Sequence, residues 1–179
     1  MTAFLNLPGI GGSGPSHWQS QWEATEPSFD RFRPGDWNRP DLCNWLVALD
    51  DAIDRSVPPP ILVAHSLACL LVSHASDRIA GRVKGAFLVA VPDPAAHAFP
   101  QEAASFADPP RGPIPFPTLI VASSDDPYAS QGYVRQRANE WNAGLIEVGA
   151  LGHINGTSNL GTWAQGRMLL DAFRAGLRG

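Results

Sequence analysis

Residues 61–69 constrain the fold of this chain more than any other segment. They read Ile-Leu-Val-Ala-His-Ser-Leu-Ala-Cys: an apolar run typical of a buried strand reaches Ser66 and then continues as a sequence that favours a helix. A strand that turns sharply into a helix at a serine holds the hydroxyl above the edge of a parallel sheet. It also leaves the next amide, that of Leu67, free at the helix N-terminus. We therefore predict a strand over 61–65, a turn at Ser66 and a helix from Leu67.

This kind of turn is typical of serine nucleophiles, and it fixes the chain order of the groups that assist them. A serine hydroxyl is a weak nucleophile until an adjacent base, oriented by an acid, accepts its proton. In this fold pattern the acid and then the histidine follow the serine along the chain. Asp126 comes after the apolar run 118–122, and His153 comes after the run 145–148. We predict that Ser66, Asp126 and His153 form a catalytic triad at the carboxyl ends of parallel strands.

The acid and the base of this triad each have a neighbouring competitor. Asp125 precedes Asp126, but adjacent side chains diverge, so we favour Asp126 and expect Asp125 to cap the turn or bind backbone N–H groups. His65 precedes the serine, and a neighbour in a tight turn points away from the hydroxyl. We therefore expect His65 to pack under the edge of the sheet. His74 lies about two helical turns beyond the serine, too far to act on it.

A glycine-rich segment near the N-terminus offers the remaining requirement, an oxyanion hole. Residues 7–14 read Leu-Pro-Gly-Ile-Gly-Gly-Ser-Gly and follow the first apolar run, where backbone amides can turn towards a developing negative charge. We predict that the amide of Leu67 is one donor and that of Ile10 or Gly11 the other. A phosphate-binding interpretation is weaker, because the segment has neither Gly-Lys-Ser/Thr nor the Gly-x-Gly-x-x-Gly spacing.

Along the whole chain, apolar runs that predict strands alternate with segments of helical periodicity. The predicted strands are 3–7, 61–65, 86–91, 118–122 and 145–148, with a weaker candidate at 29–32. The predicted helices are 16–25, 41–56, 67–78, 129–142 and 160–177. Most of the strand runs are continuously apolar, as expected for strands covered on both faces. The pattern predicts one α/β domain over residues 1–179, with a mainly parallel sheet flanked by helices on both faces.

One long segment lacks this periodicity. Eight of the 17 prolines lie between residues 92 and 117, directly after the strand that follows the serine helix. Long irregular segments in compact domains are often functional, and this position suits a lid over a substrate. An inert surface loop remains an equal alternative.

Composition narrows the function classes. The net charge of −4 gives no basic patch, which argues against nucleic acid and anionic membranes as partners. The N-terminal residues lack the features of a signal peptide and no apolar run reaches membrane-spanning length, so we expect a cytoplasmic protein. His65, Cys69 and His74 have no recognised metal-ligand spacing, and Cys69 is expected to be a small buried apolar residue. We expect neither a metal nor a cofactor.

The motifs together resemble the small serine hydrolase family that includes retinoblastoma-binding protein 9 and the bacterial YdeN-like proteins. The resemblance covers nearly the whole chain and rests on Pro8-Gly9, His17-Trp18 with Trp22, Asp36-Trp37, Arg39-Pro40 with Trp45, His65-Ser66-Leu67, Ser124 to Tyr128, Gly152 to Asn155, and Trp163. It implies a compact α/β-hydrolase core without a large cap domain and a triad of Ser66, Asp126 and His153. Trp18 and Asn155 are candidate pocket residues. Ala68 departs from the family pattern, which usually has glycine there.

These observations favour a serine hydrolase that cleaves a small ester or related acyl compound through an acyl-enzyme. One alternative is a non-catalytic module that binds a partner protein through an apolar, tryptophan-containing surface. Another is a lyase or perhydrolase that uses the same triad.

Overall fold

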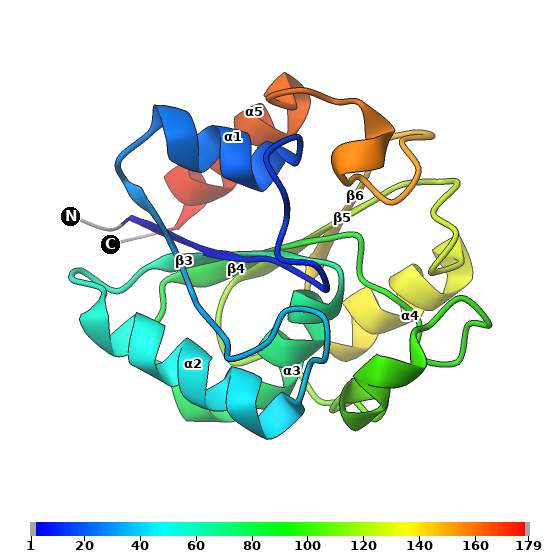
Figure 1. Ribbon diagram of the computed structural model, residues 1–179, viewed down its shortest axis with the longest axis horizontal. Coiled ribbons are helices and arrows are strands. Elements are labelled where there is room, and N and C mark those ends of the chain that lie inside the picture. The colour runs from blue at the N-terminus through cyan, green and yellow to red at the C-terminus, as the bar shows by residue number, and fades with distance from the viewer. Residues whose placement is uncertain (1–2, 178–179) are drawn as a thin grey trace.

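The computed structural model describes residues 3–177, in which six strands form one parallel sheet (Figure 1). In spatial order the strands are β2 (Phe29–Arg31), β1 (Phe4–Leu7), β3 (Ile61–His65), β4 (Gly85–Val89), β5 (Thr118–Ala122) and β6 (Gly144–Glu147). The helices are α1 (Trp18–Thr25), α2 (Leu42–Arg55), α3 (Leu67–Ile79), α4 (Gln131–Glu140) and α5 (Ala164–Gly176), with 3₁₀ turns η1 (Gln101–Phe106) and η2 (Gly156–Ser158). The predicted parallel sheet is confirmed, and every strand pairing in it is parallel.

Several elements are shorter than periodicity predicts, and local backbone conformation explains where they stop. The predicted strand 86–91 ends at Val89 because Ala90 has a φ of 57°, outside the strand region. The predicted helix 160–177 begins only at Ala164, since Trp163 has a φ of 41°. The apolar pattern of the sequence continues through both residues, so it does not predict where these two elements stop.

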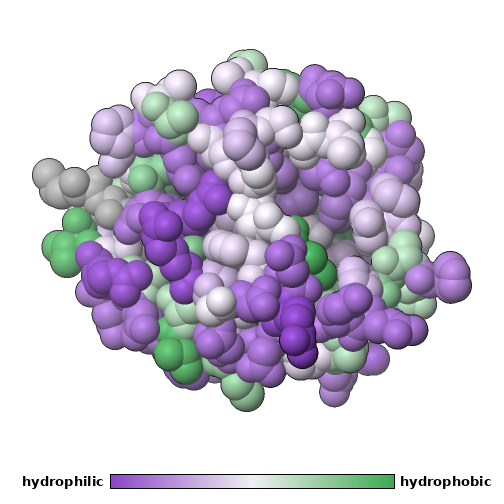
Figure 2. Space-filling model, in the orientation of Figure 1, coloured by the Kyte–Doolittle hydropathy of each residue, from purple (hydrophilic) through white to green (hydrophobic). Residues whose placement is uncertain are grey.

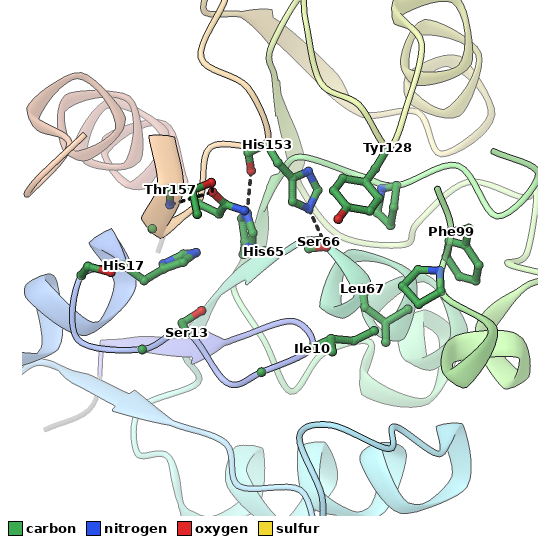
Figure 3. Close-up of a pocket in the computed structure, with 17 residues that line it drawn as sticks. Ile10, Ser13, His17, His65, Ser66, Leu67, Phe99, Tyr128, His153 and Thr157 are labelled. Carbon is green, nitrogen blue, oxygen red and sulfur yellow. Dashed lines mark hydrogen bonds between the residues drawn. The ribbon is translucent and has the colours of Figure 1, made fainter. Parts of the chain in front are cut away.

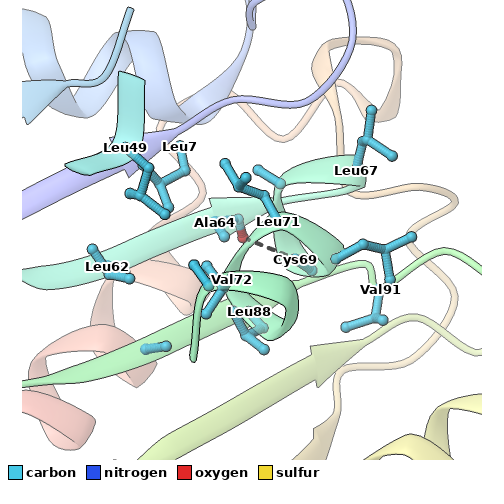
Figure 4. Packing of buried hydrophobic residues seen from close by; sticks show 14 of the residues in the cluster. Leu7, Leu49, Leu62, Ala64, Leu67, Cys69, Leu71, Val72, Leu88 and Val91 are labelled. Atoms are coloured by element: carbon cyan, nitrogen blue, oxygen red, sulfur yellow. Dashed lines mark hydrogen bonds between the residues drawn. The ribbon is translucent and has the colours of Figure 1, made fainter. Parts of the chain in front are cut away.

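The sheet separates two apolar layers, with α2, α3 and α4 on one face and α1 and α5 on the other (Figure 1). Side chains alternate between the faces along each strand. In β3, Leu62 and Ala64 join the layer beneath α2 and α3, part of which Figure 4 shows, whereas Ile61 and Val63 join the layer beneath α1 and α5. Both faces are therefore covered, as the continuous apolar runs of the strands predict.

The tryptophans are core residues rather than surface residues. Five of the six are at most 4% exposed: Trp18, Trp22, Trp45, Trp141 and Trp163. On one face of the sheet the rings of Trp18, Trp22 and Trp163 contact one another, with centroids 4.5–6.1 Å apart. The prediction that Trp18 lines a pocket is therefore wrong: its position in α1 turns the ring towards the sheet. The large apolar side chains that are exposed lie far apart in sequence, at Ile10, Val47, Val57 and Met168.

The view in Figure 2 agrees with this distribution, since hydrophilic residues cover most of that face and apolar ones are scattered. Residues 3–177 therefore form no apolar docking surface that contains tryptophan. Within the same residues, no helix is both long and apolar enough to cross a membrane.

The proline-rich segment 92–117 is anchored in the core. Its η1 turn packs against α3, and the side chains of Ala103 and Phe106 are completely buried. Ile114 and Phe116, near its end, are buried in the same apolar layer. The segment is therefore a fixed wall in this structure rather than a detached flap.

Two histidines, His17 and His65, are buried beside one another, with ring centroids 4.6 Å apart. The pKa of His17 is lowered from 6.5 to about 4, chiefly by burial and to a smaller extent by the nearby charges of Arg31 and His153. Burial also holds the pKa of His65 well below its usual value, with smaller contributions from His17 and His153. Both imidazoles are therefore neutral near pH 7.

We expect these histidines to make the fold sensitive to acid. The unfolded chain binds protons at both residues near pH 6.5 while the folded chain does not, so stability falls as the pH drops below about 6.5. For His17 the loss approaches roughly 3 kcal/mol once the pH reaches its folded pKa of about 4. Urea unfolding at pH values between about 7 and about 5 measures this loss of stability. The His17→Asn variant should lose less stability than the parent over this range, and equal losses in both proteins would contradict the assignment.

Candidate active site

The turn between β3 and α3 holds Ser66 in a conformation that residues other than glycine rarely adopt. Its φ is 56° and its ψ is −127°. The Ser66 amide donates to the carbonyl of Val89 at 3.0 Å, and its own carbonyl accepts from the amide of Cys69 at 2.8 Å. Ala64 and Ala68, which replace the usual glycines, are both completely buried beside the turn. The sharp turn thus forms with alanine at both positions, and it leaves the hydroxyl free of a helix-capping role.

The structure brings Ser66, His153 and Asp126 into one hydrogen-bonded chain (Figure 3). His153 Nε2 lies 2.8 Å from Ser66 Oγ, and His153 Nδ1 lies 2.9 Å from each carboxylate oxygen of Asp126. Since a carboxylate only accepts, Nδ1 carries the proton and Nε2 faces the hydroxyl as an acceptor. The Asp126 carboxylate is 4% exposed and also accepts from the amide of Tyr128 at 2.9 Å.

Asp125 points elsewhere and ties two loops together. One of its carboxylate oxygens accepts from the hydroxyl of Ser123 at 2.7 Å and from the amide of Gly152 at 2.8 Å. These two hydrogen bonds, that from Ser123 foremost, lower the pKa of the Asp125 carboxyl. The loop after β5, which carries Asp126, is thereby joined to the loop that carries His153.

Two further side chains donate hydrogen bonds to the backbone of the loop that carries His153. His65 Nε2 donates to the carbonyl of His153 at 2.9 Å, and the Trp18 indole donates to the carbonyl of Ile154 at 2.7 Å. Ile154 is completely buried and has a φ of 48°, so the loop turns sharply into the core just after the histidine. His65 therefore packs beneath the base instead of competing for the Ser66 proton, as the tight turn predicts.

Two backbone amides beside the serine turn remain candidates for an oxyanion hole. Those of Leu67, at the start of α3, and of Ile10 have no hydrogen-bond acceptor among residues 3–177. The Gly11 amide donates to the carbonyl of Trp37 at 3.0 Å, so Gly11 is wrong as a predicted donor. The contact with the Trp37 backbone, 26 positions away, is not visible in the glycine-rich sequence itself.

Gly9 brings this loop against the serine turn. A methyl group added at Gly9 would lie 3.0 Å from Ser66 Cβ, 3.1 Å from the carbonyl oxygen of His65 and 3.4 Å from the amide nitrogen of Leu67. These contacts are tighter than a side chain normally makes, so a methyl group at Gly9 would push the neighbouring atoms away by a few tenths of an ångström. The position of the Ile10 amide therefore depends on Gly9.

A cavity of about 400 Å³ opens at Ser66. Apolar side chains, Ile10, Leu67, Phe99 and Tyr128, lie on one side of Ser66 in Figure 3, and Ser13, His17 and Thr157 lie on the other. Asn155 lines the cavity as predicted, whereas Trp18 does not. Asp, Glu, Lys and Arg are all missing from the described residues that line it.

Among the lining residues that sequence reasoning missed are Phe99, Tyr128 and His17. Phe99 lies in the irregular segment 92–117, Tyr128 follows the acid by two positions, and His17 precedes α1. Tyr128 could have been found by its place at the carboxyl end of β5, and its ring lies 4.3 Å from that of His153. Phe99 has no comparable signal. Within residues 3–177 no cluster of His, Cys, Asp and Glu side chains fits a metal ion.

Comparisons with known proteins agree with this fold. A hydrolase from Pectobacterium atrosepticum described as YdeN-like is 30% identical, with a TM-score of 0.88 over 100% of this chain and 94% of its own. The ydeN gene product of B. subtilis is 18% identical, with a TM-score of 0.79 over 98% of this chain and 100% of its own. Mouse alpha/beta hydrolase domain-containing protein 10 is 14% identical, with a TM-score of 0.68 over 97% and 90%. The last two likenesses concern the fold alone.

The comparisons confirm the α/β-hydrolase core and the resemblance to YdeN-like hydrolases. A search of curated protein sequences gave no match. The model of the family described as serine hydrolase matches residues 4–172, nearly the whole chain. This chain therefore belongs to the serine hydrolase family.

Proposed function

We propose that the protein hydrolyses a small, uncharged ester through an acyl-enzyme on Ser66, with His153 as the base and Asp126 as its orienting acid. The observation that carries this proposal is the hydrogen-bonded chain from Ser66 Oγ through the His153 ring to Asp126, in which Ser66 and His153 line the cavity. The tautomer that Asp126 imposes leaves Nε2 ready to accept the serine proton.

In the first half of the reaction, Ser66 Oγ attacks the ester carbonyl carbon as His153 Nε2 takes its proton. The carbonyl oxygen becomes an oxyanion, which the amides of Leu67 and Ile10 stabilise. When the tetrahedral intermediate collapses, the bond to the alcohol oxygen breaks and His153 returns the proton to that oxygen. The alcohol leaves, and the acyl group remains on Ser66 as an ester.

In the second half, water replaces the alcohol. His153 Nε2 accepts a proton from the water as the water oxygen attacks the acyl carbon. The amides of Leu67 and Ile10 again stabilise the oxyanion that forms. The bond to Ser66 Oγ then breaks, His153 protonates Oγ and a carboxylic acid is released. Asp126 stabilises the imidazolium that forms in each half.

The cavity supports the choice of substrate class. Its volume of about 400 Å³ lies near the lower end of the range for small-molecule sites. A charged group buried there would have no countercharge among the lining residues and would be costly to desolvate. Size and charge together favour a small neutral ester.

The Ser66→Ala variant should lose hydrolysis of activated esters such as p-nitrophenyl acetate by several orders of magnitude while remaining folded, because only binding and the oxyanion hole remain. The same variant should no longer be labelled covalently by a fluorophosphonate. Circular dichroism and urea unfolding establish that the variant is folded. Near-parental turnover or labelling by a folded variant would exclude Ser66 as the nucleophile.

Replacing the two neighbouring aspartates separates the acid from its competitor. Asp126→Asn should lower kcat by up to about 10⁴-fold, because an amide in that place favours the wrong imidazole tautomer. Asp125→Asn should cause a far smaller loss, since Asp125 contacts Ser123 and Gly152 rather than the imidazole. Steady-state kinetics of both variants shows which aspartate orients the His153 imidazole. A larger loss for Asp125→Asn would show that Asp125 is the acid.

Gly9→Ala should lower kcat by about ten- to a hundredfold, because the added methyl pushes the Ile10 amide away from the developing oxyanion. Gly112→Ala is the matched control, as a methyl group there would meet nothing within 4 Å. Steady-state hydrolysis of one activated ester by both variants is the measurement. Unchanged kcat in Gly9→Ala would mean that the loop does not supply an oxyanion donor.

A further inference from the structure

His17 presents a hydrogen-bond donor whose partner is missing. Its Nδ1 accepts from the backbone amide of Gln19 at 3.2 Å, which caps the start of α1. Because a backbone N–H can only donate, Nδ1 carries no proton, and in the neutral ring the proton is on Nε2. Nε2 is buried and finds no hydrogen-bond partner among the described residues.

The position of this donor links it to the cavity. His17 is 5% exposed and lines the cavity, and in Figure 3 its imidazole extends from the wall towards His65 and the middle of the site. The ring of His65 lies 4.6 Å away between centroids in an edge-to-face arrangement, and an aromatic ring is at best a weak acceptor. A buried polar group left without a partner is rare in native proteins and calls for an explanation.

The surroundings of His17 indicate which partner fits. The nearby lining residues, Ser13, Ser16, Asn155 and Thr157, are polar and uncharged. His17 is itself neutral near pH 7, so this side offers hydrogen bonds without a countercharge. An uncharged acceptor oxygen, of an ether, hydroxyl or carbonyl group, matches that chemistry.

The opposite side of the cavity has the complementary character. Ile10, Leu67, Phe99 and Tyr128 present mainly carbon atoms there, with Ser66 between the two sides (Figure 3). An ester bound with its carbonyl at Ser66 therefore extends one part towards hydrocarbon and the other towards His17.

We propose that His17 is a specificity-determining residue whose Nε2–H donates to an uncharged oxygen in the part of the ester that lies opposite its hydrocarbon part. This proposal rests on the proposed esterase function. The oxygen can belong to the alcohol or to the acyl part, and the two arms of the experiment distinguish them.

Two variants separate the donor from the cap. In His17→Asn the shorter side chain retains an acceptor for the Gln19 amide, since asparagine is a good N-cap, but the Nε2–H is gone. In His17→Gln the amide group reaches the place of Nε2 and restores a donor, while the cap is lost. The first variant should fold normally without the donor, and the second should keep the donor at lower stability.

The substrates are two pairs of esters in which one CH₂ group is exchanged for oxygen. Butyl butanoate and 2-methoxyethyl butanoate test the alcohol part, and ethyl pentanoate and ethyl 3-methoxypropanoate test the acyl part. Within each pair the ratio of kcat/KM for the ether to that for its hydrocarbon partner is measured, and this ratio is compared between proteins. The comparison cancels the difference in intrinsic reactivity between the two esters.

For one of the pairs, the ether-to-hydrocarbon ratio should fall by roughly three- to tenfold in His17→Asn and be largely retained in His17→Gln, as expected for one hydrogen bond. That pair identifies which part of the ester faces His17. Ratios unchanged in both pairs, in a folded His17→Asn variant, would overturn the proposal.

Binding of the same esters to the Ser66→Ala variant, with and without His17→Asn, gives a readout that needs no turnover. If the parent hydrolyses none of the esters, yet Ser66→Ala prefers an ether in a manner that requires His17, the proposed function fails and the subsite stands. If binding also shows no dependence on His17, the subsite is overturned. Calorimetric titration measures these affinities.

Discussion

The strained turn at Ser66 is the constraint on which the rest of the site depends. A positive φ in a residue with a side chain persists only where neighbouring structure holds it. Here the sheet and the helix both hold it, because the Ser66 amide donates to Val89 in β4 and its carbonyl accepts from Cys69 in α3. One consequence is that the hydroxyl stands clear of α3 and meets His153. A second consequence is that the loop containing Gly9 passes within contact distance of the serine turn.

Three imidazoles lie edge to face beneath and beside this turn, and their environments divide their roles. The ring of His65 lies 4.6 Å from that of His17 and 5.0 Å from that of His153. Burial lowers the pKa of both His17 and His65, so neither takes up a proton near pH 7. Of the three, only His153 faces a carboxylate, that of Asp126. In the proposed mechanism the proton exchanged with Ser66 is therefore confined to the ring of His153. The neutral ring of His65 donates to the carbonyl of His153, and the neutral ring of His17 accepts from the amide of Gln19.

Much of this arrangement follows from the sequence because it is set by strand ends. Continuous apolar runs identify the strands, and the loops and turns that follow β3, β5 and β6 meet at one edge of a parallel sheet. What could not be predicted depends on contacts between distant segments. The Gly11 amide is taken by the carbonyl of Trp37, and the Trp18 indole reaches the carbonyl of Ile154, 136 positions away. Periodicity within one segment carries no information about either contact.

The irregular segment between β4 and β5 illustrates the same limit. Its prolines argue against a long strand or α-helix over 92–117, but they do not reveal that Phe106 and Ala103, in η1, fill the core beside α3. That burial fixes Phe99, a few residues earlier, as part of the cavity wall. Phe99 and His17, which both line the cavity, thus lie on segments other than those that carry Ser66, Asp126 and His153. The two residues differ in their connection to the triad. His17 lies against His65, which donates to the carbonyl of His153, whereas Phe99 packs against the apolar layer on the α3 side of the sheet. Substrate preference can therefore change at Phe99 while the hydrogen bond between His153 and Ser66 stays in place.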